Sequence, residues 1–72
     1  MYEYIVYLME HGVYTTKNVK KTQEEADMII EQARETGLFE KYLLIVRDVN
    51  LDMPVQMETD YFSAMTRKRK GR

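Results

Sequence analysis

The sequence predicts a small α+β domain of ββαββ order, in which one helix covers one face of a four-stranded antiparallel sheet with strand order 2-1-3-4. Three observations support this class: a β-rich hairpin pattern before residue 20, a helix start at Thr22, and two further strand-like runs after Gly37. A length of 72 residues allows a single domain. We expect this domain to span residues 1–62 and a flexible basic tail to follow over residues 63–72.

The first two strands form a tight hairpin in this prediction. Residues 2–9 read YEYIVYLM, a run of β-branched and aromatic side chains that is typical of a strand. Gly12 takes a positive φ without steric cost, so Glu10, His11 and Gly12 predict the turn. Residues 13–19 return with fewer apolar side chains, as expected of an edge strand.

The helix is predicted from its two ends. Thr22 and Glu25 match a capping box, in which the hydroxyl of Thr22 accepts from the third amide of the helix and Glu25 reaches back to the cap. Gly37 suits the left-handed position that ends a helix. The residues between them that share one apolar face are Ala26, Ile29, Ile30, Ala33 and Gly37.

The second pair of strands follows the helix. Residues 41–49 form the most apolar run of the chain, which predicts a strand covered on both faces. Residues 50–54 have the composition of a turn. Residues 55–61 alternate and predict a half-buried strand, with Val55, Met57, Thr59 and Tyr61 on one face and Gln56, Glu58 and Asp60 toward water. The first and third strands are the most apolar, so we place them in the centre.

Both faces of this sheet carry large apolar side chains, yet there is one helix to cover them. On the first strand, Tyr4 and Val6 point to one side while Ile5 and Tyr7 point to the other. The uncovered face therefore predicts either the seam of a symmetric homodimer or a ligand platform. Tyrosine is enriched at interfaces, and the interface candidates are Tyr2, Tyr4, Tyr7, Tyr42 and Tyr61.

Charge divides the chain into two segments of opposite sign. Residues 1–66 hold six basic and twelve acidic residues, a net charge of −6, and residues 67–72 add five positive charges. The tail is a candidate arm for nucleic-acid phosphates, a segment that docks on the acidic body, or a solvated end. Stacking of bases on the sheet tyrosines is a related hypothesis, although an acidic sheet would repel a polyanion. The candidate nucleic-acid contacts are Arg67, Lys68, Arg69, Lys70 and Arg72.

No motif predicts catalysis or a cofactor. There is no cysteine, and His11 is the single histidine, which we interpret as a solvated turn residue. Asp48, Asn50 and Asp52 have the spacing that opens a calcium loop, but Met53 stands where that loop needs glycine. We interpret this segment as a polar turn and predict no catalytic residue, no metal and no cofactor.

The hairpin, the T-x-E-E-A helix start at residues 22–26, the apolar strand after it and the absence of catalytic motifs together resemble small accessory proteins of bacteriophages and mobile elements. That resemblance implies a protein that binds and redirects a host factor. We therefore predict a non-enzymatic, cytoplasmic binding module without a membrane segment, which is a homodimer and modulates a protein partner. Its acidic body suits a basic target such as a nucleic-acid-binding protein. A nucleic-acid-binding accessory protein, using the basic tail and the sheet tyrosines, is the alternative.

Overall fold

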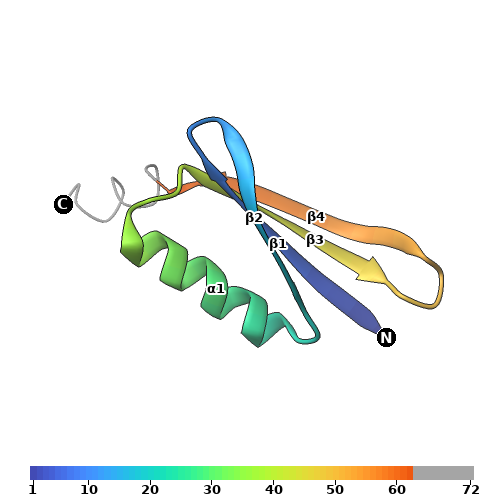
Figure 1. The fold of residues 1–72 in the computed structure, drawn as a ribbon. Coiled ribbons are helices and arrows are strands. Elements are labelled where there is room, and N and C mark those ends of the chain that lie inside the picture. The colour runs from blue at the N-terminus through green and yellow to red at the C-terminus, as the bar shows by residue number, and fades with distance from the viewer. Residues whose placement is uncertain (63–72) are drawn as a thin grey trace.

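The computed structural model describes residues 1–62 and confirms the ββαββ prediction (Figure 1). A four-stranded antiparallel sheet has the order β2-β1-β3-β4, with the helix α1 on one side of it. The α1 helix is too short and too polar to cross a membrane, and residues 1–62 contain no other candidate. The elements are β1 (Tyr2–Glu10), β2 (Val13–Lys20), α1 (Gln23–Thr36), β3 (Lys41–Asp48) and β4 (Met53–Tyr61).

The β1–β2 hairpin has the tight turn that its glycine predicts. Glu10 pairs with Val13, which leaves His11 and Gly12 as a two-residue loop. Both loop residues have positive φ, 54° for His11 and 80° for Gly12. Two positive φ values are typical of the type I′ turn, whose twist matches that of a two-stranded ribbon. The amide of Gly12 donates to Oε1 of Glu40 at 3.1 Å, which ties this turn to the segment before β3.

The ends of α1 follow the capping prediction with one difference. Thr22 Oγ1 accepts from the amide of Glu25 at 3.2 Å, as expected of an N-cap. Glu25 reaches back as expected and accepts from the hydroxyl of Thr22 at 3.3 Å, but the amide that it binds, also at 3.3 Å, is that of Lys21. At the other end, Gly37 has φ 72° and closes the helix in the left-handed conformation.

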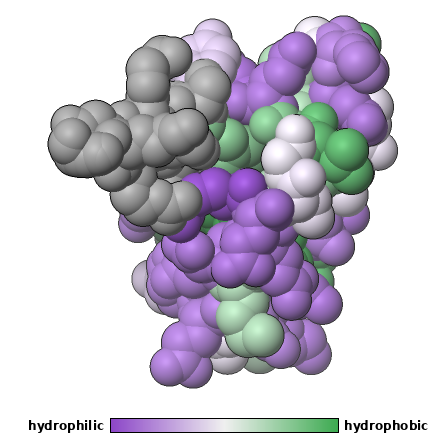
Figure 2. Space-filling view, turned by 90° about the vertical axis from the view of Figure 1, so that its left-hand side faces the viewer, coloured by the Kyte–Doolittle hydropathy of each residue, from purple (hydrophilic) through white to green (hydrophobic). Residues whose placement is uncertain are grey.

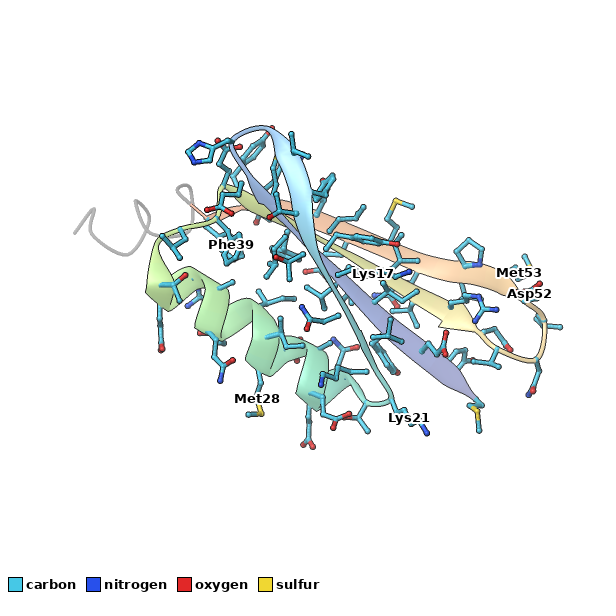
Figure 3. All side chains as sticks on the ribbon, in the orientation of Figure 1. Lys17, Lys21, Met28, Phe39, Asp52 and Met53 are labelled. Atoms are coloured by element: carbon cyan, nitrogen blue, oxygen red, sulfur yellow. The ribbon has the colours of Figure 1, made fainter. Side chains whose placement is uncertain are left out.

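The hydrophobic core lies between α1 and the sheet. The helix packs mainly on β1 and β2, and Phe39 also points into this layer (Figure 3). Ala26, Ile30 and Ala33 form the buried stripe of α1, as the sequence predicts, while Ile29 packs at its border. The sheet and the residue after β4 supply the rest of the core: Val6, Leu8, Tyr42, Leu44, Val46 and Phe62.

The prediction of a half-buried β4 is wrong, because this strand is exposed along its whole length. The reason is the position of α1, which lies over β1 and β2 and leaves β4 at the far edge of the sheet. Gln56, Glu58 and Asp60 flank the helix side of the sheet, since they pair with the buried residues of β3. Met57, Thr59 and Tyr61 therefore point to the opposite side.

Candidate functional site

The open face is the side of the sheet that points away from α1. Alternation and register define it: Ile5, Tyr7 and Met9 on β1 are only half-buried, while their neighbours Val6 and Leu8 are in the core. Residues directly opposite each other on antiparallel strands share a face. Each of these three side chains therefore belongs to a row of side chains that crosses the sheet on the open face. No helix of residues 1–62 covers this face. The sequence prediction of one uncovered apolar face is thereby confirmed.

One half of the open face is aliphatic. Ile5 lies between Val19 of β2 and Ile45 of β3, and Ile45 lies next to Met57 of β4. We call these four side chains the aliphatic half. Val19 and Met57 are 47% and 64% exposed, while Ile5 and Ile45 are half-buried. Two further exposed apolar side chains lie at this end of the sheet but outside the open face: Leu51 is in the β3–β4 turn, and Met53 pairs with Asp48 on the helix side.

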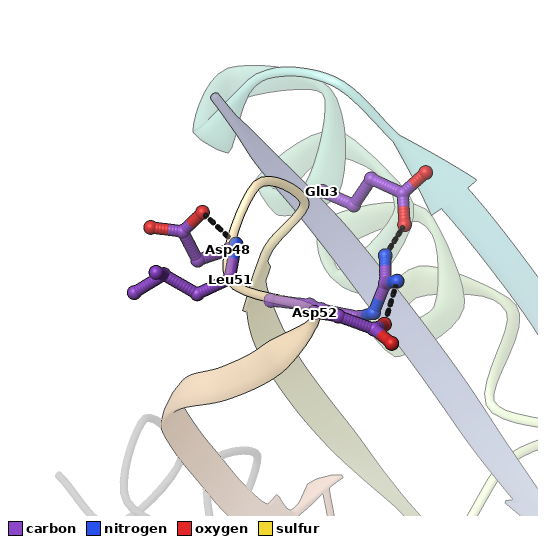
Figure 4. A network of polar contacts seen from close by, with 5 residues as sticks. Glu3, Asp48, Leu51 and Asp52 are labelled. Carbon is purple, nitrogen blue, oxygen red and sulfur yellow. Dashed lines mark hydrogen bonds and ion pairs between the residues drawn. The ribbon is translucent and has the colours of Figure 1, made fainter.

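A charged network borders the aliphatic half (Figure 4). Arg47 Nη1 donates to Oε1 of Glu3 at 2.8 Å, and Nη2 donates to Oδ1 of Asp52. Both carboxylates stabilise the charged guanidinium, and the hydrogen bond that Arg47 donates to Asp52 contributes most to raising the pKa of Arg47. In the adjoining turn, Asp48 Oδ1 accepts from the amide of Leu51 at 3.1 Å.

These contacts explain the calcium-like spacing of Asp48, Asn50 and Asp52. Asp48 closes the turn and Asp52 binds Arg47, so the two carboxylates have different partners. Among the described residues, no three His, Asp or Glu side chains come together as metal ligands would. The spacing therefore corresponds to a polar turn in this fold.

The other half of the open face combines tyrosine and lysine. Tyr7 and Tyr14 meet edge to face, with ring centroids 6.1 Å apart. Lys17 Nζ lies 6.0 Å from the ring centroid of Tyr7, and Lys41 Nζ lies 4.8 Å from that of Tyr61. These distances fall within the range of cation–π attraction. We call these five side chains, from all four strands, the Tyr–Lys half.

Charge is segregated between the two sides of the molecule. The strands present Lys17, Lys41 and Arg47 on the open face but a single carboxylate, that of Glu3, and the adjoining turn adds Asp52 beside Arg47. The expectation of an acidic sheet is therefore wrong for this face. The carboxylates gather on the helix side, where β4 contributes Glu58 and Asp60 and the outer surface of α1 carries Glu24, Asp27, Glu31 and Glu35. Hydrophilic side chains also dominate the side of the molecule seen in Figure 2.

The five tyrosines predicted at an interface lie on two different faces. Tyr7 and Tyr61 belong to the open face, whereas Tyr2 and Tyr4 belong to the helix side by their register. Tyr42 lies in the core with 5% of its surface exposed, and its hydroxyl donates to Oε2 of Glu58 at 2.5 Å. Burial, reinforced by this bond and by the charge of Glu58, raises the pKa of Tyr42.

One member of the Tyr–Lys half, Tyr14, was not among the predicted interface residues. A β-bulge explains its position, because Met9 pairs with Tyr14 while Leu8 pairs with Thr16. Thr15 is thus the unpaired residue of the bulge, and Tyr14 points to the same face as Tyr7. The predicted nucleic-acid contacts, Arg67, Lys68, Arg69, Lys70 and Arg72, lie outside the described residues.

No protein-family model, curated protein or solved structure matches this chain.

Proposed function

We propose that this protein is a non-enzymatic binding module that forms a homodimer through the aliphatic half of the open face and binds a protein partner. The observation that carries this proposal is a row of aliphatic side chains across all four strands, on which no other element of residues 1–62 packs. Exposed apolar rows of this kind are typical of interaction surfaces. We place this activity in the cytoplasm, where a small accessory protein of a phage or mobile element would meet its target.

The distribution of charge favours a homodimer joined by the aliphatic halves over one joined by the whole open faces. If two open faces packed over their full area, Lys17 and Lys41 of each copy would add positive charge to the seam without enough acid to balance it. The aliphatic half avoids this conflict. Its border network already pairs Arg47 with Glu3 and Asp52, so little unpaired charge is buried.

The size of the seam sets its strength. Strand spacing and rise give the whole open face roughly 19 by 27 Å, or about 500 Å² per copy, so the aliphatic half offers about 250 Å². Stable interfaces bury about 800 Å² per partner, so we expect a weak dimer whose population depends on concentration.

Two methionines provide a matched test. Met57 on the open face is 64% exposed, and Met28 on the outer surface of α1 is 59% exposed and points away from the sheet (Figure 3). Met57→Lys should abolish self-association in sedimentation equilibrium, because it places a charge in an apolar seam. Met28→Lys should leave it unchanged. A wild-type protein that stays monomeric at every accessible concentration would rule out the homodimer.

In such a homodimer the acidic helices point outward. The outer surface of α1 carries Glu24, Asp27, Glu31 and Glu35 around Met28, which suits a basic protein, such as one that binds nucleic acid. Chemical cross-linking in nuclease-treated lysate, followed by mass spectrometry, identifies such a partner. The pair Asp27→Lys and Glu31→Lys should then lose a cross-linked protein that Lys21→Gln retains. If the acid-to-lysine variants retain every cross-link, the helix is not the contact surface.

A further inference from the structure

The Tyr–Lys half has the composition of a nucleic-acid platform. Three tyrosine rings and two lysine side chains come from four strands and lie on one face. Tyr14 and Tyr61 are 37% and 54% exposed, so their rings are accessible to a ligand. None of the side chains that share these two rows of the open face is acidic.

We propose that the Tyr–Lys half binds single-stranded nucleic acid, with bases stacked on Tyr14 and Tyr61 and phosphates held by Lys17 and Lys41. Any base offers a π face to a tyrosine ring, so stacking works without a defined sequence. A duplex hides those faces inside its own stack and offers this sheet only its phosphates. The chemistry of the face therefore favours a single strand.

Three carboxylates next to this site in the sequence accept hydrogen bonds from neutral donors, which hold them in place and leave their negative charge. Asp60 Oδ1 accepts from the amide of Tyr61 at 2.8 Å, and Glu40 accepts from the amide of Gly12. Glu10 Oε1 accepts from the hydroxyl of Thr15 at 3.5 Å. The acids of α1 lie on the other side of the sheet, and a helix is about 10 Å thick. Their repulsion is screened, because the Debye length is about 8 Å at physiological ionic strength.

The last described strand ends beside this site, and the basic residues follow it in the sequence. Lys41 pairs with Tyr61, so β4 ends within the Tyr–Lys half. Five residues lie between Tyr61 and Arg67, and six residue steps span at most about 20 Å. The five positive charges of residues 67–72 therefore begin within reach of a strand bound to the Tyr–Lys half.

This inference does not require the homodimer. The Tyr–Lys half and the aliphatic half occupy different rows of the open face, so a dimer joined by its aliphatic halves keeps both nucleic-acid sites. A monomer would bind one strand by the same contacts. Failure of self-association and failure of nucleic-acid binding are thus separate outcomes.

The test is fluorescence anisotropy with labelled oligoribonucleotides of about 10 nucleotides, a length within the usual site size of such platforms. Tyr61→Ser should weaken binding about 5- to 150-fold, the change expected for one lost stacking contact. Tyr2→Ser is the matched control, because Tyr2 is 46% exposed but lies on the helix side of β1. Tyr61→Phe should bind like the unmodified chain, since it keeps the ring. Circular dichroism establishes that each variant is folded.

Salt dependence separates the sheet from the tail. Lys41→Gln should reduce the slope of log affinity against log salt by about 0.7, the contribution of one phosphate contact in a single strand, while Lys21→Gln should not. Deleting residues 67–72 should reduce the slope further but leave the effect of Tyr61→Ser in place. Three results would overturn the proposal: no binding at low salt, equal affinity for duplex and single strand, or identical binding by the Tyr61→Ser and Tyr2→Ser variants.

Discussion

Leu44 and Ile45 are neighbours on β3 that point to opposite faces, so truncating each in turn tests the arrangement of layers. Leu44 is 1% exposed in the core on the helix side of the sheet, and Ile45 is half-buried on the open face. Replacing a fully buried leucine by alanine costs about 3 kcal/mol through lost transfer energy and the cavity that remains. The total stability of a chain of this size is about 4–10 kcal/mol, so Leu44→Ala removes a large share of it. Ile45→Ala should cost about half as much in the monomer.

Urea unfolding followed by circular dichroism measures both variants. The free energy of unfolding of a small domain falls by about 1 kcal/mol for each 1 M of urea. Leu44→Ala should therefore lower the urea midpoint by about 3 M at any protein concentration. If the aliphatic half is a dimer seam, the free energy of unfolding of the wild-type protein should rise with protein concentration. The rise should be about 1.4 kcal per mole of dimer for each tenfold increase, and Ile45→Ala should reduce it. Equal losses for the two variants at low concentration would refute the assignment of faces.

Further predictions concern the helix ends and the buried phenol. Thr22→Ala should lower the free energy of unfolding by about 1 kcal/mol because it removes the N-cap oxygen, and thermal melting measures the loss against Thr16→Ala as a control outside the helix. Gly37→Ala should also destabilise, by about 1 kcal/mol, since alanine disfavours a φ of 72°, and an unchanged melting temperature would contradict this. The raised pKa of Tyr42 means that the folded state resists ionisation of this phenol. The contribution of the buried, neutral phenol to folding stability is therefore complete below pH about 10. It is lost as pH rises from there toward the folded-state pKa, because the unfolded chain ionises first. Alkaline unfolding should therefore be less steep in Tyr42→Phe, and Glu58→Gln should allow the phenol to ionise at lower pH in ultraviolet titration.

The sequence predicts the elements of this fold because each has its own local chemistry. Gly12 marks the hairpin, Thr22 caps the helix and Gly37 ends it, and these positions need no knowledge of the tertiary structure. Strand order also follows, because the most apolar strands belong in the centre. Alternation correctly separates Val6 from Tyr7 onto opposite faces.

Alternation cannot identify which face the helix covers. The tyrosines at 7 and 42 both suit a half-buried strand, yet Tyr42 lies in the core beside Phe62 and Tyr7 lies on the open face. The lateral position of α1 is equally hidden, so β4 was expected to be half-buried. These features depend on how a helix packs across several strands, which no single segment encodes.

Net charge likewise conceals the charge of a surface. The acidic total of residues 1–66 suggested an acidic sheet, but the cations of the open face come from separate strands and meet only through their register. The sequence did contain a signal for this. Alternate residues of a strand point to the same face, so Lys41, Leu43 and Ile45 all belong to the uncovered face once that face is recognised. The tyrosine at position 14 was harder to place, because a bulge shifts its register.

The edges of the sheet bear on how this protein associates. On β4, Pro54 provides no amide donor, the bulge leaves Val55 unpaired, and Asp60 engages the amide of Tyr61. On β2, the bulge at Thr15 interrupts the ladder and lysine side chains are frequent. Such features discourage a second sheet from adding to either edge. The open face has no comparable protection in its aliphatic half, so association of this chain should proceed through the face of the sheet and not through its edges.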